Sequence, residues 1–366
     1  MAYGNRTMDL PVNPPVKPML AKAMKAIPDG ELSFEPKWDG FRCIVFRDGD
    51  ELELGSRNEK PLTRYFPEVI EPLKACLPDK CVVDAELIVA SGDALDFDAL
   101  QQRIHPAESR VNMLAEKTPA EVMAFDLLAL GDQNLLETPF AERRNLLESI
   151  SGDFAPPLRL TPTTTDQKVA LRWFDEFEGA GLDGLIMKPL DGNYIENKRT
   201  QFKLKHTREA DCVVAGYRTH KSGDGVGSLM LAMYDDDGNL HHMGVAASFT
   251  AKRRVEFVDE LAPHLLTDIS EHPWADWLEA EAHMSTDGKM PGAPNRWSAG
   301  KGGQAWTPLR PTQVVEVSYV QITNQRFRGT TRFVRWRPDR DAESCRFDQL
   351  EEITPIPLSQ VFDPTH

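Results

Sequence analysis

The sequence predicts two domains, an α/β domain followed by an all-β barrel domain. Strand-like runs alternate with amphipathic helical patterns in the first part of the chain, as in α/β folds. From Asp211 onward the pattern changes to short strands separated by turn signals such as Asp237-Gly238, which indicates a small barrel. The length of 366 residues suits about two or three domains. We therefore predict domains at residues 1–206 and 207–366.

Local patterns predict the elements of the first domain in chain order. The proline-rich segment 11–20 favours extended chain over helix. Two strands, at residues 41–46 and 51–54, are expected to be joined by a tight hairpin at Asp48-Gly49. Apolar residues at helical spacing predict helices over residues 61–76 and 166–179. Further strands are expected at residues 81–89, 121–128, 185–188 and 202–205.

The second domain carries weaker but repeated strand patterns. A helical insert is expected at residues 252–265, and residues 287–303, rich in Gly, Pro and Ser, predict a long loop. Gly223-x-Gly225-x-Gly227 leads into a strand rather than a helix, so it fails the dinucleotide-binding pattern and predicts a flexible loop. The strands of the barrel are expected at residues 213–217, 229–234, 240–245 and 314–320.

Composition and charge argue against several classes of protein. No apolar run reaches the length of a membrane span, and the N-terminus lacks an apolar signal core, so we expect a cytoplasmic protein with no membrane partner. The five cysteines are scattered without a C-x-x-C pair, which disfavours both a zinc site and a disulfide framework. The net charge of −15 argues against indiscriminate nucleic-acid binding, although the C-terminal third contains a cluster of arginines.

One stretch, Glu35–Arg42, has the pattern E-x-K-x-D-G-x-R. Its Gly40 lets the backbone turn tightly beside a bulky ligand, and the strand that follows places Lys37 on a loop held by a sheet. A lysine attacks phosphorus only as the neutral amine, which burial or neighbouring cations favour. By itself, the pattern fits an exposed lysine beside an Asp-Gly turn equally well.

Further motifs follow downstream in a fixed order. They are S-R-N at residues 56–58, D-A-E-L at 84–87, F-D-L-L at 125–128, D-G-L-I-M-K at 183–188, F-K-L-K at 202–205 and R-F-V-R-W-R-P-D-R at 332–340. Together with K-x-D-G-x-R, this series resembles motifs I, Ia, III, IIIa, IV, V and VI of ATP-dependent DNA ligases. The resemblance covers almost the whole chain, and the short length is most similar to compact bacterial LigC-type ligases. It implies a nucleotidyltransferase domain followed by an OB-fold domain.

The resemblance implies a three-step reaction. Lys37 attacks the α-phosphorus of ATP, expels pyrophosphate and becomes lysyl-AMP. The AMP then passes to the 5′-phosphate of a DNA nick, and the 3′-hydroxyl displaces it. Lys203 and Lys205 occupy alternate positions of one strand, so both point to the same face, where they can contact the α-phosphate and favour the neutral amine.

The resemblance also implies a Mg²⁺ site, in which Mn²⁺ can substitute. It assigns Glu86 to the ribose or the metal and Asp183 to the metal, and carboxylates with phosphate oxygens suit Mg²⁺. The family usually has Glu where this sequence has Asp183. The side chain is one methylene shorter, so we expect a water-bridged contact there.

The remaining site residues are also carried over from the resemblance. Phe125 is expected to stack on adenine, whereas Arg337 and Arg340 of motif VI are expected to orient the leaving pyrophosphate. Other C-terminal arginines would grip DNA phosphates. Taken singly, these residues also fit a core aromatic and a solvated basic strand. Contacts to the nucleotide or the nick phosphate are expected from Glu35, Arg42, Arg57 and Arg199.

Two rival functions share part of this pattern. An mRNA capping guanylyltransferase or RNA ligase also carries K-x-D-G and motif V, but motif VI and the OB-fold domain speak against a simpler RNA ligase. A non-catalytic DNA-end-binding scaffold has no need of a nucleophilic lysine. We therefore expect a monomeric enzyme of DNA repair that binds nicked double-stranded DNA and associates with the nucleoid. By resemblance only, Ku or primase-polymerase repair proteins are further partners.

Overall fold

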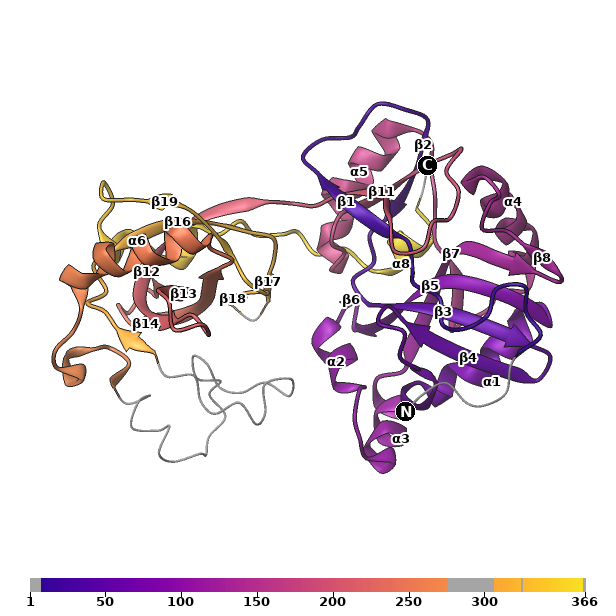
Figure 1. The fold of residues 1–366 in the computed structure, drawn as a ribbon, viewed down its shortest axis with the longest axis horizontal. Coiled ribbons are helices and arrows are strands. Elements are labelled where there is room, and N and C mark those ends of the chain that lie inside the picture. The colour runs from indigo at the N-terminus through magenta and orange to yellow at the C-terminus, as the bar shows by residue number, and fades with distance from the viewer. Residues whose placement is uncertain (1–7, 276–305, 324, 365–366) are drawn as a thin grey trace. The chain divides into compact units, whose positions relative to one another are not determined.

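The computed structural model describes residues 8–275, 306–323 and 325–364, and the expected loop at 287–303 lies outside these ranges. The chain forms two compact units (Figure 1). The first comprises the chain up to Lys205 together with the segment from Ile353, and the second comprises His206–Glu352.

The C-terminal segment corrects the expected extent of the second domain, 207–366. The short helix α8 (Ser359–Phe362) belongs to the first unit, where Leu358 and Val361 are buried in one cluster with Trp38 and Phe177. The backbone N–H of Leu358 also donates to Asp93 O at 2.8 Å. The tail therefore belongs to the first unit, because the apolar side chains of the tail are buried in the core of that unit.

A large mixed sheet of seven strands forms the frame of the first unit, with the central order β4-β3-β5-β7-β8. The antiparallel strands β3, β5 and β7 are buried on both faces. One face packs on α1, and the other packs on the N-terminal segment through Met8, Leu10 and Val16. The strands are β3 (Phe41–Asp48), β4 (Glu51–Ser56), β5 (Lys80–Ser91), β6 (Ala94–Leu95), β7 (Ala120–Leu130), β8 (Gln133–Asn134) and β9 (Leu158–Leu160).

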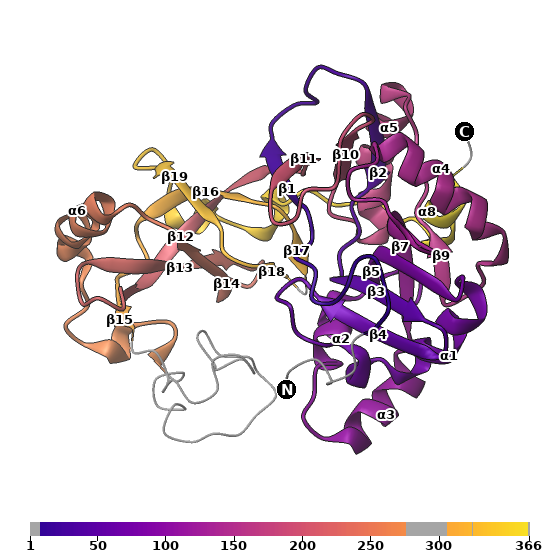
Figure 2. The same ribbon diagram turned by 45° about the vertical axis from the view of Figure 1, so that its right-hand side comes forward.

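A second sheet of four strands has the order β1-β11-β10-β2 and carries the lysine-rich end of the unit. Its strands are β1 (Leu20–Met24), β2 (Leu32–Pro36), β10 (Leu185–Pro189) and β11 (Arg199–Leu204). Trp173 and Phe177 of α5 pack against Phe34 and Met187 of this sheet, and Figure 2 shows α5 beside β2 and β10. This packing fixes β2 and β10, the two strands that adjoin the loops of the site.

The predicted helices of the first unit are confirmed with small changes at their ends. The expected helix 61–76 begins only at Pro67, because residues 63–65 form a 3-10 turn. The helices are α1 (Pro67–Cys76), α2 (Phe97–Gln102), α3 (Glu108–Lys117), α4 (Phe140–Ile150) and α5 (Gln167–Phe177). The predicted hairpin joins β3 to β4, and Gly49 adopts a left-handed φ of 60° at its turn.

Among its described residues, the second unit forms a β-rich barrel that carries an α-helix. Its sheet has the order β14-β13-β12-β16-β19, and Thr331 closes it by exchanging backbone hydrogen bonds with Val245 and Ala247 of β14. The helix α6 (Ala251–Leu261) confirms the helical insert, and the glycine-rich loop leads directly into β13 as expected. The strands are β12 (Arg208–Thr219), β13 (Val226–Tyr234), β14 (Leu240–Ala247), β15 (Thr307–Pro308), β16 (Val314–Tyr319), β17 (Ile322–Thr323), β18 (Arg326–Phe327) and β19 (Arg332–Trp336).

Within the part of the chain that the structure describes, no helix combines the length and apolar character needed to cross a membrane.

A buried ion pair ties α4 to β7 and predicts a large stability effect. Both side chains are fully buried, and Arg143 Nε donates to Asp126 Oδ1 at 2.8 Å. We expect Arg143→Met to lower the free energy of unfolding by about 3–5 kcal/mol, because it leaves the Asp126 carboxylate buried without its counter-ion. Lys74→Met, which breaks an exposed pair with Glu71, should cost less than about 1 kcal/mol. Denaturant unfolding measures both, and equal midpoints for the two variants would contradict the assignment.

Candidate active site

The loop that carries Lys37 is held against the loop that precedes β10. Lys37 N donates to Gly184 O at 2.8 Å, and Asp183 N donates to Lys37 O at 3.0 Å. These two backbone hydrogen bonds join segments that are distant in sequence and set their side chains face to face. Lys37 Nζ lies 2.7 Å from Asp183 Oδ2, and Lys205 Nζ contacts the same oxygen. The structure thus brings two predicted lysines together around one predicted carboxylate.

The electrostatics of Asp183 follow from this contact. Burial by itself would raise the pKa of the Asp183 carboxyl, but the charges of Lys37 and Lys205 outweigh burial and lower it. The carboxyl is therefore ionised over the ordinary pH range. An ionised oxygen that already accepts from two ammonium groups is a strong anchor for cations and a poor acceptor of a further proton.

Gly40 allows the Lys37 loop to lie directly on β5. A Cβ atom at this position would stand 2.1 Å from Leu87 O and 2.8 Å from Glu86 Cγ. The expected reason for this glycine was a tight turn beside a ligand, whereas the structure shows a close approach of backbone to backbone. This approach places Glu86 beside Lys37, close enough for the lysine charge to act on the pKa of Glu86.

A cleft of about 100 Å³ lies between the two sheets of the first unit. One wall comes from β2, β10 and β11, and the other comes from β3, β5 and β7. Its lining includes five residues predicted from the sequence and five that were not assigned a role. The predicted ones are Glu35, Lys37, Arg42, Glu86 and Phe125, and the others are Pro36, Trp38, Ile186, Lys188 and Gln201.

On the wall formed by the large sheet, Arg42 and Glu86 face each other across β3 and β5. Burial raises the pKa of Glu86 to about 7, although the charges of Arg42 and Lys37 oppose the shift. Arg42 donates through Nε and Nη2 to the two carboxylate oxygens of fully buried Asp84. Its guanidinium carbon lies 4.5 Å from the centroid of the Phe125 ring. Phe125 therefore lines the cleft with two cations, Arg42 and Lys188, beside its ring.

On the opposite wall, Lys188 and Glu35 form a buried pair that the sequence did not single out. Lys188 Nζ lies 2.8 Å from Glu35 Oε1 and 3.1 Å from Phe125 O, and the two residues are each 2% exposed. Burial lowers the pKa of Lys188 and raises that of Glu35, and their mutual attraction opposes both shifts. Lys188 is the last residue of D-G-L-I-M-K, so its position in that motif was the available signal.

Three further predicted cations lie outside the cleft lining. Lys203 stands opposite Ile186 in the β10–β11 register, and burial, together with the charges of Lys205 and Lys37, lowers its pKa. The charge of Arg57, which follows β4, also lowers the pKa of Lys203. Arg199 is the exposed first residue of β11.

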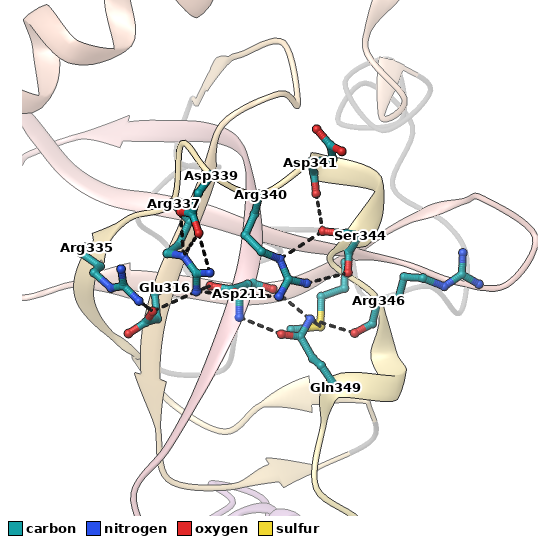
Figure 3. A network of polar contacts seen from close by, with 11 residues as sticks. Asp211, Glu316, Arg335, Arg337, Asp339, Arg340, Asp341, Ser344, Arg346 and Gln349 are labelled. Atoms are coloured by element: carbon teal, nitrogen blue, oxygen red, sulfur yellow. Dashed lines mark hydrogen bonds and ion pairs between the residues drawn. The ribbon is translucent and has the colours of Figure 1, made fainter.

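Arg337 and Arg340 lie in the second unit, within a network of carboxylates (Figure 3). Buried Asp211 is the centre of this network. Arg337 Nη1 lies 3.1 and 3.0 Å from its two carboxylate oxygens, and Arg340 Nη1 lies 3.2 Å from Oδ2. Arg337 also pairs with Glu316 and Asp339. The sequence indicated the arginines but gave no signal for Asp211.

The fit of Gly40 to β5 predicts a stability effect. Gly40→Ala should lower the free energy of unfolding by about 1–3 kcal/mol, because the new methyl group overlaps the backbone of β5 and forces it to shift. Gly152→Ala is the matched control, since a Cβ at Gly152 would meet open space. Thermal or denaturant unfolding measures the difference. Equal stability of the two variants would show that the loop does not rest on β5.

Comparisons with known proteins agree with this geometry. Residues 17–205 match the ATP dependent DNA ligase domain, and residues 222–340 match the ATP dependent DNA ligase C terminal region. DNA ligase C2 of Mycolicibacterium smegmatis is 55% identical over 94% of this chain and 96% of its own length. DNA ligase C of Mycobacterium tuberculosis is 53% identical over 97% of this chain and 99% of its own length.

A solved structure of a Lig E DNA ligase supports the fold alone. It covers 87% of this chain and 99% of its own, with a TM-score of 0.52 and 16% identity. The first unit is accordingly an adenylation domain, and the second is an OB-fold domain. The two family models that match describe ATP dependent DNA ligases, and neither describes a capping enzyme or a non-catalytic scaffold. The chain belongs to the ATP-dependent DNA ligases and resembles the mycobacterial ligases of the C type.

Proposed function

We propose that Lys37 is the nucleophile that carries AMP during ligation. The observation that supports this proposal is the position of Lys37 on the lining of the cleft, against Asp183 and near Lys205. In the first step, a bond forms between Nζ and the α-phosphorus of ATP, and the bond to the bridging oxygen breaks. Pyrophosphate leaves with the electron pair, and Nζ loses its proton. AMP then passes to the 5′-phosphate of a nick, and the 3′-hydroxyl displaces it.

In this proposal, the cations and the carboxylate around Lys37 have different roles. Because the pKa of Asp183 is lowered, its contact orients the Lys37 amine and does not serve as the final proton acceptor. Lys203 and Lys205 would stabilise the charge that develops on the α-phosphate, the main requirement of phosphoryl transfer. Lys203 is suited to this, since a partly buried cation acts in a less screened environment than a solvated one.

The nucleoside would occupy the cleft between the two sheets. Phe125 would contact the face of adenine, with Glu35 beside the base and Arg42 and Glu86 beside the ribose. Buried side chains with fixed partners support this assignment, because Glu35 is held by Lys188, and Arg42 is held by Asp84. Arg57 and Arg199, outside the lining, would contact phosphates of the nucleotide or of the nick.

Glu86 and Asp183 would hold Mg²⁺, with Mn²⁺ as a substitute. The charge of Lys37 acts on the pKa of both carboxyls, which supports a position for both near the α-phosphate. Among the described residues, no group of three or more His, Cys, Asp or Glu could hold a metal by itself. Two carboxylates nevertheless fit Mg²⁺, which is usually bound by one or two carboxylates together with substrate phosphates and water. When bound, the ion would neutralise charge on the phosphate oxygens.

Arg337 and Arg340 would assist release of pyrophosphate. In the structure, their guanidinium groups contact carboxylates of their own unit, so this role requires them to exchange those partners for phosphate oxygens. Guanidinium groups bind carboxylate and phosphate oxygens with the same planar geometry, which makes such an exchange feasible.

The DNA substrate would be a nicked duplex met during repair. The net charge of −15 predicts weak affinity for intact duplex, so binding should concentrate at nicks through local arginines. We propose a monomer, and we keep Ku and primase-polymerase proteins as proposed partners that would bring the enzyme to DNA ends.

The first prediction from this proposal tests the nucleophile. Lys37→Ala and Lys37→Arg should abolish transfer of label from α-labelled ATP to the protein, since arginine stays protonated at working pH. Lys22→Ala, which changes an exposed lysine of β1, should be labelled like the wild type. Denaturing electrophoresis of the labelled protein measures the outcome. Retained labelling of either Lys37 variant would refute the assignment.

The second prediction tests the metal ligands. Glu86→Ala and Asp183→Ala should each reduce lysyl-AMP formation at least about tenfold at low Mg²⁺, because each removes an oxygen ligand. Added Mn²⁺ should restore part of the rate, since it binds the same ligands more tightly. Asp132→Ala, at an exposed ion pair, is the control. Initial rates over a metal titration measure the effect, and wild-type rates for both variants at low Mg²⁺ would exclude a metal role.

The third prediction separates the steps. Arg337→Ala and Arg340→Ala should impair lysyl-AMP formation but spare the sealing of a nick that is supplied already adenylated, because pyrophosphate leaves only in the first step. Arg346→Ala, which breaks an ion pair with exposed Asp236 and lies outside motif VI, is the control and should spare both steps. Single-turnover assays of both steps measure the separation. Equal loss of both steps would instead identify motif VI as a DNA-binding surface.

A further inference from the structure

Gln201 is a buried polar side chain whose amide nitrogen has no hydrogen-bond partner. The residue is 2% exposed, and its Nε2 atom is both buried and unpaired. A buried donor without a partner costs roughly 1–3 kcal/mol, so such groups usually bind water or a ligand. Gln201 lines the cleft together with Glu35, Phe125 and Lys188. The unpaired donor thus belongs to the same cleft that would hold the nucleoside.

The strand register places Gln201 at the opposite end of the cleft wall from Lys205. Side chains alternate along β11, so Gln201 and Lys203 share one face, and Lys205 directly follows the strand. Ile186 stands opposite Lys203, and the same antiparallel register sets Gln201 beside Lys188. Four residues of extended chain separate Gln201 from Lys205 by at most about 13 Å. This distance is comparable with the length of a nucleoside monophosphate, so phosphate at Lys205 would bring the base to Gln201.

We infer that Gln201 reads the edge of the nucleobase by donating a hydrogen bond from Nε2 to a ring nitrogen of adenine. This inference rests on the proposed function, since it takes Lys37 and Lys205 to mark the phosphate end. The aromatic ring of Phe125 offers the base a face, whereas Gln201 offers a donor to its edge. Adenine presents unprotonated ring nitrogens that accept hydrogen bonds, which matches a donor that lacks a partner.

Thr200 provides a matched control on the neighbouring residue. Its hydroxyl is also buried and unpaired, and it borders a small cavity of about 10 Å³ that Gln201 and Lys188 line as well, but it is absent from the lining of the nucleoside cleft. Alternation along β11 points its side chain away from the face of Gln201 and Lys203. Thr200→Val therefore removes an unpaired polar group from the same strand without removing the proposed contact.

The test measures lysyl-AMP formation by Gln201→Leu over a range of ATP concentrations. We expect the ATP concentration at half-maximal rate to rise about tenfold, the equivalent of about 1.4 kcal/mol, with the rate at saturating ATP unchanged. Thr200→Val should leave both quantities unchanged. Gln201→Met, which keeps the length of the side chain without its donor, should repeat the effect. Thermal unfolding of each variant identifies any loss that comes from misfolding.

Analogues of ATP then separate base contact from a structural role. Wild type and Gln201→Leu are compared with 1-deaza-, 3-deaza- and 7-deaza-ATP, each of which lacks one ring nitrogen. One analogue should bind the wild type more weakly and show no further loss in Gln201→Leu. An equal loss for ATP and all three analogues, or no loss in either Gln201 variant, would overturn the inference and leave Lys37 in place. A wild-type protein that ATP does not label would overturn the proposed function, and the Gln201 contact with it.

Discussion

The contact of Asp183 with Lys37 and Lys205 is the interaction on which the geometry of the site depends. It brings together a loop after β2, a loop before β10 and the residue that follows β11, and two backbone hydrogen bonds between Lys37 and Asp183–Gly184 fix the first pair. Because one carboxylate anchors two ammonium groups, a change at Asp183 alters the position of both lysines. The pair of sheets then extends this cluster into the cleft that Glu35, Phe125 and Lys188 line.

The two units hold their cationic side chains in a similar way. In the first, cations that face the cleft are held by buried carboxylates, as Arg42 is held by Asp84 and Lys188 by Glu35. In the second, Asp211 holds Arg337 and Arg340. Fixed partners keep long cationic side chains in place before substrate arrives, which reduces the entropy lost on binding. The role proposed for Arg337 and Arg340 requires phosphate oxygens to replace their carboxylate partners.

The sequence predicted the fold class and the residues that carry motifs, because those depend on local pattern. Alternation along residues 202–205 predicts one face for Lys203 and Lys205, and Lys203 lies close enough for the charge of Lys205 to lower its pKa. The roles of Gln201, Lys188 and Asp211 were not predicted, since they arise from register between strands that are distant in sequence. The burial of the C-terminal tail against Trp38 was missed for the same reason. A short apolar segment gives no sign of the core that it will join.

The most direct test of the central claim is to locate AMP on the protein by mass spectrometry. The full chain is incubated with ATP and divalent metal, digested, and searched for a peptide that carries one AMP. The account predicts AMP on the Nζ atom of Lys37, with none on Lys188, Lys203 or Lys205, because Lys37 meets the α-phosphate while the other lysines only stabilise charge or structure. AMP on one of those three lysines, with Lys37 unmodified, would contradict it.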